Sequence, residues 1–274
     1  MKSKLKHIIG NFLVFTLPNR TSKLTSKGIT LGMDKSLVNR LIRFALLKNA
    51  ENTGDYEALA IYHQNYWSSQ GKEYFSSELG QNVLEDFFLP KCSFVFDLLE
   101  KKLNHSTDIY NTLIEIGTGD GSVLEHLSTR FPQINRFIGI DLSIPQIHDN
   151  KEKYSDNKRL EFVASDGFDW IEENGYSNTI IVTSRGVLEY FTQDRLTHFF
   201  DKLNNIGQIL FIAIEPTGVD HDFSKNPNSQ VYSFEGSFSH NYARIFEESG
   251  FELWHQSKIL QYKDVYFNFF GAKC

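Results

Sequence analysis

The chain is poor in the residues that cross-link or interrupt a fold. Its 274 residues include two cysteines, Cys92 and Cys274, and six prolines. Two cysteines can form neither a disulfide framework nor a four-cysteine zinc site, so we expect a reducing, cytoplasmic environment. The sequence also lacks self-similarity at a period of about twenty to fifty residues, which argues against a repeat array.

Long apolar runs and an excess of basic residues are missing as well. The apolar run at residues 8–17 is too short for a membrane-spanning helix, which needs about twenty residues. With 41% hydrophobic and 23% charged residues, the composition is typical of a folded soluble protein. The net charge of −6 gives no support for nucleic-acid binding through phosphates.

The charge is unevenly distributed along the chain. Residues 1–50 contain ten Lys and Arg and a single acid, Asp34, whereas the remainder carries a net charge of −15. We expect residues 1–35 to form a basic arm that packs its apolar side chains on the main domain, with contact to an anionic membrane surface as the alternative. The basic start also resembles a secretory signal or an organelle transit peptide, but no cleavage site of the Ala-x-Ala type follows the apolar run.

Residues 36–108 have the pattern of a helical extension. Apolar positions recur at helical spacing over residues 36–47, 56–67 and 83–103, and Pro90 interrupts the third stretch. Asp34 is the expected N-cap of the first helix. The second helix is rich in aromatic residues, which makes this extension a candidate lid over a site in the main domain.

From residue 109 to 274, short apolar runs alternate with helical patterns. Strands are predicted at residues 112–116, 137–140, 160–164, 179–182 and 208–214, and helices at 122–131, 145–154 and 193–203. This alternation predicts an α/β, mostly parallel and doubly wound sheet. A helix at 240–250 and two aromatic-rich runs, 251–255 and 259–272, predict an antiparallel C-terminal hairpin, which completes a seven-stranded sheet.

A glycine-rich turn stands between the first predicted strand and its helix. It reads Glu115-Ile116-Gly117-Thr118-Gly119-Asp120-Gly121. Gly117 allows a sharp turn, and Gly119 lets a ligand approach the backbone closely. Asp141 ends the second strand at the spacing of a carboxylate that accepts both hydroxyls of a ribose, and Asp166 ends the third, where it can accept from an adenine amino group. The alternative for either acid is a cap on the helix that follows.

A dinucleotide site is the competing interpretation of this turn. The Gly-x-Gly-x-x-Gly register would place Ser122 at the third glycine, and Asp120 would repel a pyrophosphate. A cationic adenosine ligand without a phosphate fits an acid-flanked turn better.

Three further motifs follow the later strands: Gly139-Ile140-Asp141, Ala164-Ser165-Asp166-Gly167 and Ser184-Arg185-Gly186-Val187-Leu188-Glu189-Tyr190. Together with the glycine turn, they resemble the successive motifs of class I S-adenosylmethionine-dependent methyltransferases, over about residues 110–270. The resemblance implies S-adenosylmethionine as the cofactor and S-adenosylhomocysteine as its product. The residues that it implies for cofactor binding are Glu115, Gly117, Thr118, Gly119, Asp141, Leu142, Asp166, Gly167, Ser184 and Arg185.

The resemblance also implies individual roles within this set. Asp141 would hold the ribose, and Asp166 with Gly167 would frame the adenine. Glu115 would orient the glycine turn or meet the amino group of the cofactor. Ser184 and Arg185 would pass beneath the sulfonium, although an arginine is a less usual occupant of that loop and a structural ion pair is its alternative role.

The acceptor side of the site is less well marked. Methyl transfer to a hydroxyl usually needs a general base. Our candidates for this base are His240, at the start of the last helix, and His221, in the long polar loop at residues 215–239; a helix cap is the alternative role at His240. For acceptor binding we predict Tyr62, Tyr66 and Trp67 from the lid and Glu215 and Phe238 from the loop, because aromatic faces bind cations. The three lid residues equally fit a helix that packs into the core.

Missing motifs narrow the reaction. Ser184-Arg185-Gly186 stands where enzymes that methylate exocyclic amines of bases have an Asn-Pro-Pro-Tyr type of motif. No His/Asp cluster resembles the magnesium-dependent catechol type, so we expect no metal. We therefore predict methyl transfer to an O or N atom of a small-molecule or natural-product acceptor, without a nucleic-acid partner. The alternatives are a protein-side-chain methyltransferase, a non-methylating member of the same fold such as an aminopropyl transferase or a cofactor-binding scaffold, and a nicotinamide oxidoreductase.

Overall fold

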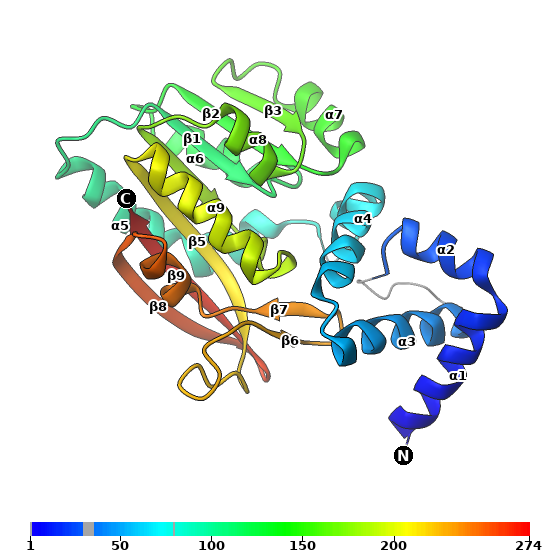
Figure 1. Ribbon diagram of the computed structural model, residues 1–274. Coiled ribbons are helices and arrows are strands. Elements are labelled where there is room, and N and C mark those ends of the chain that lie inside the picture. The colour runs from blue at the N-terminus through cyan, green and yellow to red at the C-terminus, as the bar shows by residue number, and fades with distance from the viewer. Residues whose placement is uncertain (1, 30–35, 79) are drawn as a thin grey trace.

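The computed structural model describes residues 2–29, 36–78 and 80–274 (Figure 1). The helical elements in chain order are α1 (Lys2–Thr16), α2 (Pro18–Ser26), α3 (Leu37–Thr53), α4 (Tyr56–Phe75), the π-helical η1 (Leu84–Cys92), α5 (Ser93–Asn104), α6 (Ser122–Arg130), α7 (Ile144–Lys153), α8 (Gly167–Asn174), the single-turn η2 (Leu188–Tyr190), α9 (Gln193–Ile206) and α10 (Tyr242–Glu248). The strands are β1 (Thr112–Ile116), β2 (Arg136–Asp141), β3 (Leu160–Ala164), β4 (Thr179–Thr183), β5 (Ile209–Gly218), β6 (Gln230–Tyr232), β7 (Ser237–Ser239), β8 (Glu252–Tyr262) and β9 (Val265–Lys273).

The main sheet has seven strands in the order β3-β2-β1-β4-β5-β9-β8. The first five are parallel to one another, and β9 pairs antiparallel with both β5 and β8. Every residue of β1, β4 and all but the last of β5 is buried, which explains why these strands read as continuous apolar runs. The predicted α/β sheet with an antiparallel C-terminal hairpin is confirmed.

Helices cover both faces of the sheet (Figure 1). One face packs against α5, α6 and α7 through a core that includes Phe96, Leu124 and Ile147. The other packs against α8, α9 and α10, where Phe168 and Phe199 stack with ring centroids 3.8 Å apart. With both faces covered, the open edge at the ends of the parallel strands is where a ligand can reach the sheet.

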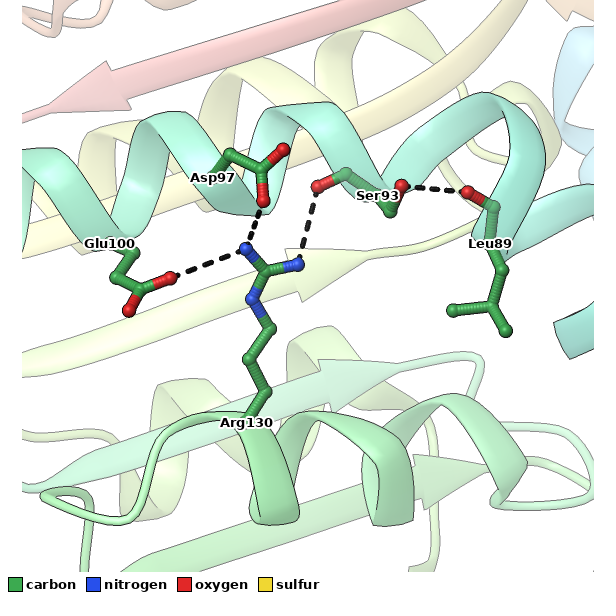
Figure 2. A network of polar contacts seen from close by, with 5 residues as sticks. All are labelled: Leu89, Ser93, Asp97, Glu100 and Arg130. Carbon is green, nitrogen blue, oxygen red and sulfur yellow. Dashed lines mark hydrogen bonds and ion pairs between the residues drawn. The ribbon is translucent and has the colours of Figure 1, made fainter.

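The helix that follows the glycine turn is tied to the helical extension by one arginine. Arg130, at the end of α6, forms ion pairs with Asp97 and Glu100 of α5 and donates to the carbonyl of Ser93 (Figure 2). Ser93 in turn donates to the Leu89 carbonyl of η1 at 2.6 Å. This network fixes α5 across α6 and so anchors the extension behind the glycine turn.

The remaining helices lie beside the strand ends. Ser36 caps α3 by accepting from Asn39, and Gly54 ends it in the left-handed conformation; Asp34, the expected cap, lies outside the described residues. The helices extend beyond the predicted 36–47 and 56–67, to Thr53 and Phe75. Within the described part of the chain, no helix is both long and apolar enough to cross a membrane.

One local prediction is confirmed and two need correction. Pro90, which has no N–H to donate, lies in π-helical η1, and α5 begins at Ser93, so the predicted 83–103 stretch is interrupted at Pro90 as expected. The C-terminal strands turn at residues 263–264 and not at 256–258, since the polar residues between the apolar runs continue the alternating pattern of β8. The loop 215–239 contains the β6–β7 hairpin, which the sequence analysis did not predict.

Candidate functional site

A large cavity lies at the carboxyl ends of the parallel strands. It encloses about 890 Å³ and is lined by the turns after β1, β2, β3 and β4, by α4 and by the β6–β7 hairpin. In open α/β sheets, ligands bind at this edge where the strand order reverses, which here is between β1 and β4. The volume lies at the upper end of the range for small-ligand sites, roughly 300–1,000 Å³.

The glycine turn lines one side of this cavity. Gly117 and Gly119 have φ values of +71° and +53°, which L side chains disfavour. A Cβ on Gly119 would lie 2.7 Å from the ring of Phe75. Asn150 of α7 donates to the Gly119 carbonyl at 2.7 Å, and the Gly117 amide donates to Ile140 of β2 at 2.8 Å. The turn is therefore held from both sides, and Gly117 and Gly119 line the cavity.

Asp141, at the end of β2, points its carboxylate into the same region. Its Oδ2 accepts from the Gly119 amide at 3.0 Å, and its Oδ1 accepts from the Ser143 amide at 2.9 Å. Burial raises the pKa of Asp141, and these backbone donors oppose that rise. The carboxylate keeps acceptor capacity beyond its bonds to the backbone, so it is able to accept from hydroxyls of a ligand.

Asp166 uses one carboxylate oxygen for structure and leaves the other unpaired. Its Oδ1 accepts from the amides of Phe168 and Asp169 at the start of α8 and pairs with Arg195 at 2.9 Å. Its Oδ2 is buried and has no hydrogen-bond partner among the described residues. The helix cap considered for Asp166 is therefore present. Because a buried acceptor without a partner is costly, the unpaired oxygen indicates that a ligand supplies the missing donor.

Glu115 lies beneath the glycine turn and does not line the cavity. It is fully buried in β1 and accepts from the Thr118 hydroxyl at 2.8 Å. Burial raises the pKa of Glu115 to about 8, opposed by hydrogen bonds from Ser184 and Thr118. Of its two expected roles, this geometry fits the one that orients the turn.

The loop after β4 completes the predicted cofactor set. Ser184 and Arg185 both line the cavity, and Gly186 donates to the Ile214 carbonyl of β5 at 2.9 Å. The guanidinium of Arg185 lies 5.2 Å from the ring centre of Phe87. It enters none of the ion pairs formed by the described residues, so the structural pairing considered for it is absent there. Nine of the ten predicted cofactor residues thus line one cavity, all except Glu115.

The acceptor residues were predicted less well. Among the five, Trp67 lines the cavity, with its ring 5.6 Å from that of Tyr190. Tyr62 and Phe238 pack in a small core between α3, α4 and β7, and Tyr66 is buried. Glu215 is buried under the loop after β4, where it accepts from the amides of Val187 and Leu188, each at 3.0 Å. We correct the prediction for these four, since none of them faces the cavity.

Neither histidine is placed to act as the general base. His240 is fully buried, does not line the cavity, and bonds through Nδ1 to Ser229. Burial lowers the pKa of His240 to about 3. His221 bonds to the Ser239 hydroxyl at 2.9 Å and to the Asn226 carbonyl at 3.0 Å, so both its ring nitrogens are occupied by hydrogen bonds within the loop and β7. The structure contradicts both assignments because these side chains face the loop interior.

Polar residues that were not predicted from the sequence to belong to the site lie at the other end of the cavity. Glu189 of η2 is buried and accepts from the Tyr232 hydroxyl of β6 at 2.6 Å. Burial, with the charge of Glu235 nearby, raises the pKa of Glu189 to about 8. Burial raises the pKa of Glu235 to about 7, opposed by the charge of Arg43. Their signal in the sequence is weak, because Tyr232 and Glu235 reach the cavity only through the unpredicted β6–β7 hairpin.

Comparison with known proteins agrees with this geometry. Residues 113–206 match the family described as a methyltransferase domain. Solved structures with the same fold include an S-adenosylmethionine-dependent methyltransferase from Leishmania major (14% identity over 82% of this chain and 89% of that one, TM-score 0.53). They also include magnesium protoporphyrin IX methyltransferase from Synechocystis (12% identity over 78% of this chain and 97% of that one, TM-score 0.52). A third is the N-methyltransferase NodS from Bradyrhizobium japonicum (14% identity over 74% of this chain and 97% of that one, TM-score 0.52). No curated protein sequence matches the chain.

The matched segment runs from β1 to the end of α9 and contains the glycine turn, Asp141, Asp166 and the loop after β4. This segment therefore resembles a methyltransferase domain, as the motifs in the sequence predict, and the chain shares the fold of the solved methyltransferases. At identities of 12–14% the structural neighbours establish the fold alone.

Proposed function

We propose that this protein transfers a methyl group from S-adenosylmethionine to an O or N atom of a small-molecule acceptor. The observation that carries the proposal is the cavity in which the glycine turn, Asp141 and the unpaired Oδ2 of Asp166 meet. The magnesium protoporphyrin IX methyltransferase and NodS structures contain S-adenosylmethionine and S-adenosylhomocysteine, respectively, which supports this cofactor.

The residues present fit an adenosyl cofactor. The Asp141 carboxylate has acceptor capacity for the two ribose hydroxyls, and the unpaired Asp166 oxygen suits the exocyclic amino group of adenine. The backbone of Gly117 and Gly119, which lines the cavity, suits the methionine part. When bound, the cofactor supplies an electrophilic methyl group on a sulfonium, and the protein aligns the acceptor and excludes water.

The rest of the cavity supports a modest-sized acceptor. Trp67, Tyr190 and Phe234 give it aromatic walls, while Glu189 and Glu235 give it carboxyl groups. We propose that Glu189, and not a histidine, takes the proton that the acceptor loses. A general base works best when its pKa is close to the working pH, and burial raises the pKa of Glu189 to about 8. The structural neighbours are named for acceptors as different as a porphyrin and sarcosine, so the fold itself does not select one.

The test is formation of S-adenosylhomocysteine by the purified protein with S-adenosylmethionine and a panel of amines and hydroxyl compounds. We expect acceptor-dependent product with the wild type and a flattened pH–rate profile for Glu189→Gln. A protein that binds S-adenosylmethionine but never forms S-adenosylhomocysteine would favour a non-methylating member of the fold. A hydride-dependent change in nicotinamide absorbance would instead favour the oxidoreductase alternative.

A further inference from the structure

The first helix carries an apolar stripe that none of the described residues covers. Leu5, Ile8, Ile9, Phe12 and Phe15 of α1 are 40–85% exposed, and Phe15 is the most exposed of them. Their spacing of three and four residues, together with the adjacent Ile8 and Ile9, places them on one face of the helix. A contiguous apolar patch of this kind is unusual on a soluble surface and marks an interaction site.

The opposite face of α1 is fixed on α3, so the direction of the stripe is set by packing. His7 bonds to the Asn49 side chain at 2.7 Å, and Asn11 accepts from the same side chain at 2.9 Å. Gly10 lies so close to α3 that a Cβ there would be 2.4 Å from the Leu41 carbonyl oxygen. The exposed side chains therefore project away from α3. Figure 1 shows α1 at the margin of the molecule, on the side away from the main sheet.

The charged side chains of α1 and α2 beside the stripe have a single sign. Lys4 and Lys6 lie exposed on α1 beside it, and α2 adds Arg20 and Lys23. The sequence contains no acid before Asp34. Basic side chains that flank an apolar helix face are complementary to an anionic lipid surface, in which the apolar side chains enter the headgroup boundary. A second copy of the chain would instead bring two basic segments together.

We propose that α1 docks this protein on anionic lipid bilayers, with its apolar stripe in the interface and its lysines at the phosphates. The helix lies on the membrane and does not cross it. Because α3 leads directly into α4, which lines the cavity, docking through α1 holds the catalytic domain at the lipid surface. This inference is independent of the proposed methyl transfer.

The test is flotation of the full chain with vesicles of phosphatidylcholine alone and of phosphatidylcholine with about one quarter phosphatidylglycerol. We expect the anionic vesicles to bind the protein at least about tenfold more tightly, and added salt to weaken binding. Phe12→Ser/Phe15→Ser should lower the affinity for vesicles by about tenfold or more, since this variant loses two aromatic side chains that the proposal buries in the membrane interface. Lys4→Glu/Lys6→Glu should lower it to a similar extent.

A matched control is Ile109→Ser/Leu260→Ser, which removes two equally exposed apolar side chains from other elements and should bind like the wild type. Circular dichroism and thermal unfolding report folding of every variant. The proposal is overturned if the wild type fails to float with anionic vesicles at low salt. It is also overturned if Phe12→Ser/Phe15→Ser binds vesicles like the wild type, or if the stripe instead holds a dimer in sedimentation and lipid binding is absent.

Discussion

Asp166→Asn separates the helix cap that the structure shows from the ligand contact that we propose for the same side chain. Three donors converge on Oδ1, namely the amides of Phe168 and Asp169 and the guanidinium of Arg195, whereas Oδ2 has no partner among the described residues. The amide oxygen of asparagine will therefore take the Oδ1 position, and its NH₂ group will take that of Oδ2. The atom that faces the ligand changes from an acceptor to a donor, while α8 keeps its cap because Asn and Asp cap equally well.

The size of the effect follows from the bond that is lost. A hydrogen bond to a charged group contributes about 1.5–3 kcal/mol, which corresponds to about 10- to 150-fold in affinity for S-adenosylhomocysteine. The inosyl analogue has a carbonyl in place of the adenine amino group and can accept from the new amide. We therefore expect Asp166→Asn to shift the preference toward S-inosylhomocysteine.

Calorimetric titration of both ligands into the wild type, Asp166→Asn and Asp169→Asn measures this shift. Asp169 pairs with the same Arg195 at 2.8 Å but is exposed and does not line the cavity, so its variant should bind like the wild type. Thermal unfolding checks that α8 is intact. Equal binding of S-adenosylhomocysteine by Asp166→Asn and the wild type would refute the reasoning and leave Asp166 as a helix cap alone.

Three further predictions address the buried groups. The folded protein holds the Glu115 proton more tightly than the unfolded chain, so this group's contribution to stability is lost as the pH rises from about 4.5 through about 8. In urea unfolding, the free energy of unfolding should therefore fall less between these pH values for Glu115→Gln than for the wild type. An equal fall in both proteins would contradict the burial argument. His221→Asn should keep the methyl-transfer rate within about threefold, whereas removal of a general base costs about 10²–10⁴-fold. A loss of that size would show that His221 is the general base after all. Arg130→Ala should cost about 1 kcal/mol of stability by freeing α6 from α5 (Figure 2), with unchanged ligand affinity; an unchanged unfolding midpoint would contradict that role.

The parts of the fold that sequence reasoning predicted share one property. Strands buried on both faces read as short apolar runs, and each ends in a glycine, acid or serine that marks the open edge of the sheet. Because parallel strands end at the same edge, Asp141 and Asp166 could be brought together from sequence spacing alone. The β6–β7 hairpin was missed because its strands have three residues each and carry no long alternating pattern.

The predicted acceptor-binding and general-base residues were mostly wrong because the direction of a side chain could not be inferred from its position in the sequence. Helix α4 carries aromatic residues around its circumference, so periodicity could not tell that Trp67 faces the cavity while Tyr62 and Tyr66 face inward. His240 was assigned to the cleft because it lies near a predicted helix start, yet its ring is buried in the loop. The three-dimensional path of that loop brings Glu235 to the cavity that Glu189 of η2 also lines, whereas neither histidine lines it.

The most direct test of the proposed function is titration of S-adenosylhomocysteine into the wild type, Asp141→Ala and Asp149→Ala, with NAD as the control ligand. Asp149 is a half-exposed acid of α7 that pairs with Lys72 and does not line the cavity. We predict micromolar binding by the wild type and Asp149→Ala, a loss of about 100-fold in Asp141→Ala, and no binding of NAD. Binding of NAD, or S-adenosylhomocysteine affinity that is the same in all three folded proteins, would contradict the assignment of this cavity.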